Sequence, residues 1–163
     1  MTGSEELTID LGRLSPEVLD LRARILRAGL DPSTAHFPGD DDPLAIHALA
    51  RRGTRAVGVG SLLPEPLEGV PGYRVRGMAV EQDYRGRGVG ARILQHLLQV
   101  AHEATGTQEE SVVTSRFTSV TPVWCHARVA ARSLYERHGF EVVGEVFVIE
   151  GIGPHVLMVQ RRA

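Results

Sequence analysis

A glycine-rich turn at residues 85–90, with the sequence Arg-Gly-Arg-Gly-Val-Gly, carries the clearest chemical signal in the chain. It follows an apolar, strand-like run, Tyr73–Val80, and precedes an amphipathic run that begins near Ala91. A strand that enters a helix through such a turn directs several backbone N–H groups, and the positive end of the helix dipole, toward one point. We therefore predict that N–H groups from about Arg87 to Ala91 bind a phosphate-like anion, with Arg85 and Arg87 adding charge.

A second segment, residues 127–140, is typical of a short helix that a glycine terminates. Together the two segments resemble the GCN5-related N-acetyltransferases (GNAT). The family's acyl-CoA signature is Arg or Gln, two free positions, Gly, one free position, then Gly or Ala, and Arg85, Gly88 and Gly90 match it. The later segment matches a helix with Ala, then Leu-Tyr-Glu, then Gly-Phe. Its matching residues are Ala131, Leu134, Tyr135, Glu136, Gly139 and Phe140.

The resemblance implies that acetyl-CoA is the cosubstrate and that its acetyl group passes directly to an amine of a small molecule or peptide. In the family, the CoA pyrophosphate lies on the glycine turn and the pantetheine arm lies along the fourth strand like an added strand. The residues expected to bind the cosubstrate are Met78, Ala79, Val80, Arg85, Gly86, Arg87, Gly88, Val89, Gly90, Ala91, Arg128 and Ala131. Arg128 replaces an asparagine that is common in the family motif, so it either reaches a phosphate or faces solvent.

Tyr135 stands where the family's general acid sits, which protonates the departing CoA thiolate. Its alternative role is structural, as a half-buried helix tyrosine with a satisfied hydroxyl. A thiol with an ordinary pKa of about 8.5 is a fair leaving group, so Tyr135 is expected to assist the reaction without being indispensable.

The proton acceptor for the attacking amine is not defined by the sequence. A primary amine with a pKa near ~10.4 is mostly protonated at neutral pH. Many relatives use a carboxylate on the fourth strand, but Tyr73–Met78 contains none. The candidates are Glu81, Glu145, Glu150 and His155, of which we select His155, at the start of the last strand, for the catalytic site. The histidines show no metal-binding spacing, so no metal is expected.

Three alternatives remain for the turn and the chain. Gly86, Gly88 and Ala91 also fit a dinucleotide-binding pattern, but five residues separate the strand from the first glycine, and too little chain follows for a second half-sheet. A purely structural turn needs one glycine, whereas three at alternate positions let a ligand approach the backbone. A non-catalytic CoA-sensing or interaction module on the same fold is the third, favoured by the missing carboxylate.

The elements that must position these groups alternate strands and helices. The sequence predicts strands at Leu7–Leu11, Ala45–Ala50, Ala56–Leu63, Tyr73–Val80, Val120 or Val123 to Ala127, Glu141–Ile149 and His155–Gln160, and helices at Pro16–Leu30, Gly88–Ala104 and Val129–His138. Residues 33–43 are too rich in helix and strand breakers for regular structure, and 105–121 fits either an early strand or an extended insert. This order predicts an α+β chain with the GNAT fold, a mixed, mostly antiparallel sheet of six to seven strands flanked by about four helices.

Composition sets the remaining expectations. With 163 residues and 42% hydrophobic content, the chain is sized for one domain, 1–163. The net charge of -2 argues against nucleic acid or an anionic membrane as partner. All 18 basic residues are arginine, so neither a P-loop lysine nor Schiff-base chemistry is possible. The single Cys125 excludes an internal disulfide, and the acidic amino terminus is unlike a signal peptide, so we expect a cytoplasmic protein, with a homodimer as a possible assembly.

Overall fold

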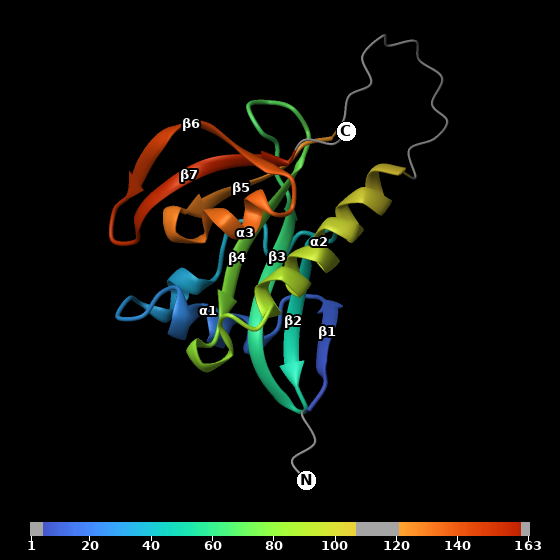
Figure 1. The fold of residues 1–163 in the computed structure, drawn as a ribbon, viewed down its shortest axis with the longest axis vertical. Coiled ribbons are helices and arrows are strands. Elements are labelled where there is room, and N and C mark those ends of the chain that lie inside the picture. The colour runs from blue at the N-terminus through green and yellow to red at the C-terminus, as the bar shows by residue number, and fades with distance from the viewer. Residues whose placement is uncertain (1–4, 107–120, 161–163) are drawn as a thin grey trace. The chain divides into compact units, whose positions relative to one another are not determined.

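The computed structural model describes residues 5–106 and 121–160, whose path Figure 1 shows. The described residues form the predicted mixed, mostly antiparallel sheet, with seven strands. These are β1 (Leu7–Gly12), β2 (Ile46–Arg52), β3 (Arg55–Pro64), β4 (Tyr73–Val80), β5 (Val123–Arg128), β6 (Phe140–Ile149) and β7 (Gly153–Gln160), in the hydrogen-bonded order β1-β2-β3-β4-β5-β7-β6. The α-helices are α1 (Pro16–Ile25), α2 (Val89–Gly106) and α3 (Arg132–Glu136).

The described part of the chain therefore holds three α-helices where the resemblance implied about four. The segment after α1 forms only a 3-10 helix, Pro32–Ala35, because its prolines and glycines interrupt any longer helix. This short helix also corrects the prediction that 33–43 lacks regular structure. The sequence left two structures open for residues 105–121, an early strand or an extended insert. This stretch, including a start of the fifth strand at Val120, lies largely outside the described residues.

The described residues group into two compact units. The first contains the residues up to Pro64 together with Val75–Leu97, and the second contains Glu65–Arg74 together with the residues from Leu98 onward. Across the described part of the chain, none of the helices combines the length and the apolar character needed to cross a membrane.

In the first unit, α1 begins and ends through local chemistry. The Ser15 hydroxyl accepts a hydrogen bond from the Val18 N–H, and Pro16 occupies the first helical turn, as predicted. The helix ends at Ile25, five residues earlier than predicted, because the Arg22 carbonyl accepts both the Leu26 and the Arg27 N–H and the chain then leaves the helix. On its apolar face, Val18 and Leu21 pack in one core with the strand residues Leu49, Val59 and Ala79.

The start of α2 lies close against β3 because β3 has glycines at the contact. A β-carbon on Gly60 would lie 2.4 Å from Met78 Sδ and 2.7 Å from Ile93 Cγ2. A β-carbon on Gly58 would meet Ile93 and Val89 at 3.0 Å. Both glycines therefore act by being small, and they fix where the first turns of α2 sit relative to β3 and β4.

In the second unit, β7 pairs antiparallel with both β5 and β6, and the first two residues of β4 pair in parallel with β5. The predicted helix Val129–His138 divides into a 3-10 helix, Val129–Ala131, and the short α3. Gly139, with φ of +83°, ends it as predicted. The last strand begins at Gly153, two residues before the predicted His155.

Candidate active site

The glycine turn connects β4 to α2, in the order that the sequence predicted. β4 ends at Val80, a 3-10 helix (Gln82–Tyr84) follows, and α2 begins at Val89. Gly86 and Gly88 have φ of +73° and +78°. Left-handed residues in such a turn can direct neighbouring N–H groups to one side. The Arg92 N–H donates to the Gly88 carbonyl at 3.1 Å and opens the helical hydrogen-bond ladder.

The N–H groups of Val89, Gly90 and Ala91 precede that ladder, so they have no intrahelical acceptor. The turn itself is exposed, and a β-carbon built on Gly86 or Gly88 would meet no atom within 4 Å. These two glycines are therefore required for their backbone angles and not for internal packing. An open turn with helix N–H donors at its end suits an anion.

The strand before the turn departs from regular geometry at Gly77, whose φ is +67°. Met78 and Val80 are partly exposed and Ala79 is buried. The Arg85 Nε donates to the Val80 carbonyl at 2.9 Å, so the side chain of Arg85 folds back onto the end of β4. Arg87 lies with its guanidinium 5.8 Å from the centre of the Tyr84 ring. Of the two predicted cationic groups, Arg85 is thus partly used within the turn.

Tyr135 lies on α3 in the second unit and is 5% exposed. Its ring packs edge-on against Phe140, with ring centres 5.5 Å apart. Among the described residues, its hydroxyl is not one of the buried side-chain atoms that lack a hydrogen-bond partner. Burial, with a smaller effect of Cys125, raises the pKa of the Tyr135 phenol far above its ordinary value. The phenol is therefore protonated at neutral pH and can donate its proton to a base.

His155 pairs with Arg128 across β7 and β5 and is 5% exposed. Its Nδ1 lies 2.8 Å from the Gly153 carbonyl, and its ring stacks on Phe147 with centres 6.0 Å apart. Because a carbonyl only accepts, Nδ1 donates a proton to this bond, and Nε2 is the ring nitrogen that is not used in it. Arg128 ends β5, and Ala131 lies in the 3-10 helix before α3.

Cys125 is buried on β5, and burial raises the pKa of its thiol to about 12 despite the opposing charge of Arg74. A thiol with that pKa is not a thiolate at neutral pH. Cys125 is therefore unsuited to carry an acyl group as a covalent intermediate.

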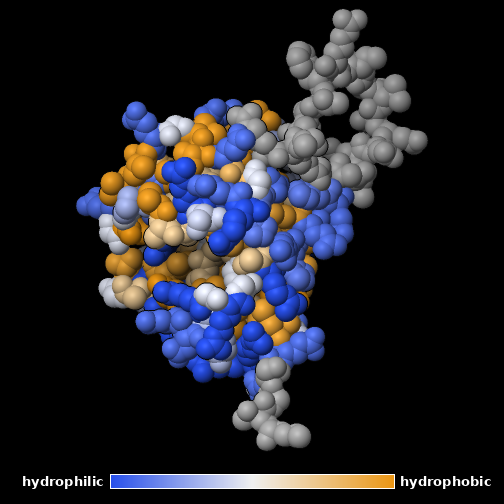
Figure 2. Space-filling view, in the orientation of Figure 1, coloured by the Kyte–Doolittle hydropathy of each residue, from blue (hydrophilic) through white to orange (hydrophobic). Residues whose placement is uncertain are grey.

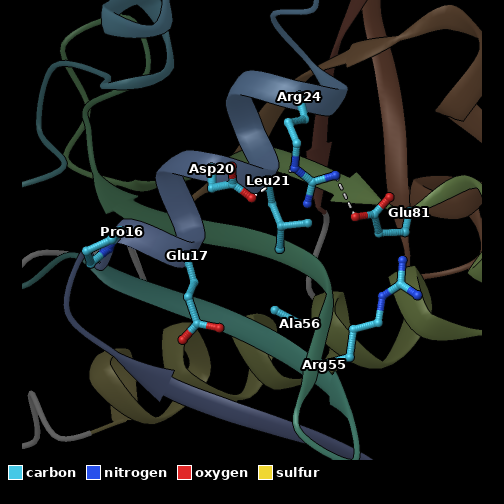
Figure 3. Close-up of a pocket in the computed structure, with 8 residues that line it drawn as sticks. All are labelled: Pro16, Glu17, Asp20, Leu21, Arg24, Arg55, Ala56 and Glu81. Atoms are coloured by element: carbon cyan, nitrogen blue, oxygen red, sulfur yellow. Dashed lines mark hydrogen bonds and ion pairs between the residues drawn. The ribbon is translucent and has the colours of Figure 1, made fainter.

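A separate open pocket of about 510 Å³ lies in the first unit between α1, the start of β3 and the end of β4 (Figure 3). Arg24 bridges Asp20 and Glu81 across it, at 2.9 and 2.7 Å. Glu81, one of the candidate proton acceptors, thus lies in an ion pair. The other carboxylate candidates, Glu145 and Glu150, are exposed at β6 and the turn after it.

Figure 2 shows apolar side chains gathered where Figure 1 draws β6 and β7. The exposed valines of β6 are Val143, Val146 and Val148.

One feature beside β4 was not predicted from the sequence: a buried polar cluster around Arg22, in contact with Gly77. The sequence does contain a signal for it, because Arg22 stands four residues after Val18 on the apolar side of α1. A charged residue at such a position must find buried partners.

Comparison with known proteins decides the family. Residues 43–142 match the model of the "Acetyltransferase (GNAT) domain". The chain belongs to the GNAT family. It is 27% identical over 145 residues to the uncharacterized N-acetyltransferase YitI of Bacillus subtilis, over 87% of this chain and 88% of that protein.

Two solved structures share the fold of this GNAT protein. Escherichia coli ElaA superposes with a TM-score of 0.74 at 18% identity, over 96% of this chain and all of that one. An acyl-CoA N-acyltransferase from Pseudomonas aeruginosa superposes with a TM-score of 0.71 at 20% identity, with the same coverage. The GNAT fold and family that the two sequence segments predicted are confirmed.

Proposed function

We propose that this protein is an N-acetyltransferase that uses acetyl-CoA and transfers the acetyl group directly to an amine of a small molecule or peptide. The observation that carries the proposal is the exposed turn at Gly86 and Gly88, which ends in the N–H donors of Val89–Ala91. Membership of an acetyltransferase family supports the reaction type.

The turn and β4 would hold the cosubstrate. Backbone N–H groups from Arg87 to Ala91 would bind the pyrophosphate, and each charge-assisted hydrogen bond is worth ~1.5–3 kcal/mol. The backbone of Met78, Ala79 and Val80 would receive the pantetheine arm as an added strand. Because Arg85 already donates to the Val80 carbonyl, we assign it a positioning contribution and assign the charge toward the phosphates to Arg87.

Tyr135 would serve as the proton donor. The amine nitrogen attacks the thioester carbon, a C–N bond forms and the C–S bond breaks, and the departing thiolate takes the Tyr135 hydroxyl proton. Burial raises the pKa of the phenol, so Tyr135 carries the proton that this role requires at neutral pH. Solvent then restores the proton on Tyr135.

His155 would take the proton that the amine loses. Its tautomer is set by the Gly153 carbonyl, which leaves Nε2 to accept. Among the four candidates, His155 is favoured over Glu81 because the carboxylate of Glu81 is bound to Arg24. Direct transfer is favoured over an acyl-cysteine route because the pKa of Cys125 is raised by burial.

The test is thiol release from acetyl-CoA with a panel of amines: polyamines, amino acids, aminoglycosides and peptide amino termini. Acceptor-dependent release with at least one class is expected, with N-acetylated product of matching yield. Tight binding of acetyl-CoA without turnover on any class would favour the alternative, a CoA-binding module that does not catalyse transfer. Absence of acetyl-CoA binding would overturn both.

A further inference from the structure

Arg22 is completely buried and anchored on several sides within the first unit. Its Nη1 donates to Asp40 Oδ2 at 2.6 Å and to the Ala35 carbonyl at 3.0 Å. Its Nη2 donates to Asp40 Oδ1 at 3.0 Å and to Ser61 Oγ at 2.8 Å. Burial disfavours the Asp40 carboxylate, but the hydrogen bonds from Arg22 and from the Phe37 N–H outweigh burial and lower the pKa of Asp40. Arg22 and Asp40 therefore form a fixed, bidentate ion pair.

His47 on β2 completes the cluster and defines the direction of its hydrogen bonds. His47 Nε2 lies 3.1 Å from the Asp40 carbonyl, which only accepts, so Nε2 carries the proton. Burial, together with the charge of Arg22, lowers the pKa of His47 and keeps the ring neutral. Its Nδ1 must then accept the Ser61 hydroxyl proton, at 2.7 Å, while Ser61 Oγ accepts from Arg22. Each of these groups has a single compatible orientation.

The unbonded edge of the guanidinium faces β4. Within the described residues, Arg22 Nε is one of two buried side-chain nitrogens that lack a hydrogen-bond partner. A β-carbon on Gly77 would lie 2.9 Å from this nitrogen and 3.1 Å from Phe37 Cε2. Gly77 is therefore constrained twice, by its left-handed φ of +67° and by the side chains against it.

The left-handed Gly77 changes which way the following residues point. Side chains alternate along a regular strand, so Arg76 and Met78 should face the same side. Instead, the Arg76 guanidinium lies 4.3 Å from the Phe37 ring centre, whereas Met78 lies against Gly60 on the side of α2. Ala79 packs with α1 residues. Gly77 thus acts as a bulge that rotates Met78 and the residues after it.

We propose that Arg22 is a positioning residue: clamped by Asp40, Ser61 and His47, it holds the Gly77 bulge and so sets the backbone direction of Met78, Ala79 and Val80. This inference rests on the proposed function, in which that backbone receives the pantetheine arm. A buried ion pair is weak support for stability alone, since apolar residues of similar volume often serve as well. The backbone conformation of β4 therefore explains the buried cluster better than a contribution to stability does.

The first variant is Arg22→Lys, which keeps the charge but loses the fork. Leu7→Ala, at a buried position of β1 away from Gly77, is the matched destabilising control. In the free proteins we expect the amides of residues 77–80 to exchange with solvent at least ~10-fold faster in Arg22→Lys than in Leu7→Ala at equal global stability. Equal exchange in the two variants would overturn the proposal.

The second measurement is acetyl-CoA affinity by titration. Arg22→Lys is expected to weaken binding ~10-fold or more, and Leu7→Ala to leave it at the wild-type value. Wild-type affinity in folded Arg22→Lys would overturn the proposal. If wild-type protein itself binds no acetyl-CoA, the proposed function fails, while the exchange measurement still decides whether Arg22 holds the bulge.

Two milder variants cover the case in which Arg22→Lys does not fold. Ser61→Ala removes one hydrogen bond to Arg22, and Gly77→Ala introduces the β-carbon 2.9 Å from Arg22 Nε. Both should raise exchange at residues 77–80 and weaken acetyl-CoA binding, Gly77→Ala more strongly because it also strains the backbone. Unchanged exchange and affinity in both would contradict the proposal.

Discussion

Tyr135 has a buried ring that packs against Phe140, and burial raises the pKa of its phenol. We expect Tyr135→Phe to lower kcat by ~10²-fold while acetyl-CoA affinity and stability barely change, because general acid help is typically worth 10²–10⁴ and the ring that packs against Phe140 is kept. Steady-state kinetics and thermal unfolding check this. An unchanged kcat from pH 6 to 9 would make solvent the proton donor.

His47 predicts how stability depends on pH. Its pKa in the folded protein is lowered by burial, below the ordinary value near 6.5. Below pH 6.5 the unfolded chain binds a proton at this site that the folded chain does not, so His47 makes stability fall as pH falls, by at most about 1.4 kcal/mol per pH unit. This contribution is fully present only above pH 6.5.

The variant His47→Gln separates this effect from those of the other histidines. Its amide can donate to the Asp40 carbonyl and accept from Ser61, but it does not titrate. Denaturant unfolding from pH 7 to pH 5 should therefore show a shallower loss of stability than in the wild type. A parallel decline in the two proteins would mean that His47 is not neutral in the folded state.

At the scale of elements, the turn between β4 and α2 offers a matched pair of glycines. Gly88 and Gly69 have φ of +78° and +80°, and a β-carbon on either meets nothing within 4 Å. Gly88→Val and Gly69→Val should each lose on the order of 1–3 kcal/mol of stability through backbone strain. Only Gly88→Val should also abolish acetyl-CoA binding, as measured by titration calorimetry. Loss of binding in both, or in neither, would contradict the anion site.

The same elements show what the sequence can predict. β4 was predicted with its observed bounds because an apolar run ends at a clear turn, and α2 because its apolar spacing is regular. The end of α1 was predicted too late because apolar residues continue to Leu30, although the carbonyl of Arg22 already ends the helix. Periodicity does not reveal such capping.

Interactions between distant residues were the harder part of the site. The cluster joins Arg22, Asp40, His47 and Ser61, up to 39 residues apart, and nothing in their spacing indicates contact. The bulge at Gly77 was missed for the same reason, since a glycine in a strand has no visible partner until the fold supplies one. The roles of Tyr135 and His155 came from family resemblance and stay predictions.

For the whole molecule, CoA binding and dinucleotide binding at the glycine turn predict opposite effects of acetyl-CoA and NAD on thermal stability. A ligand that binds only the folded state stabilises it by about 2.7 kcal/mol at 100 times its Kd, enough to raise the Tm of a domain of this size by several degrees. We expect acetyl-CoA to produce this shift and NAD and ATP to produce none.

The physical reason is the form of the turn. Five residues, including a 3-10 helix, separate β4 from Gly86, so the tight strand-to-helix turn of a dinucleotide site is missing, and the absence of lysine from the chain removes the side chain of an ATP-binding P-loop. Thermal unfolding with each ligand at matched concentration makes the comparison, and Gly88→Val serves as the control, because its Tm should not respond to acetyl-CoA. Equal stabilisation by NAD would assign the turn to dinucleotides, and a shift that persists in Gly88→Val would place the cosubstrate elsewhere.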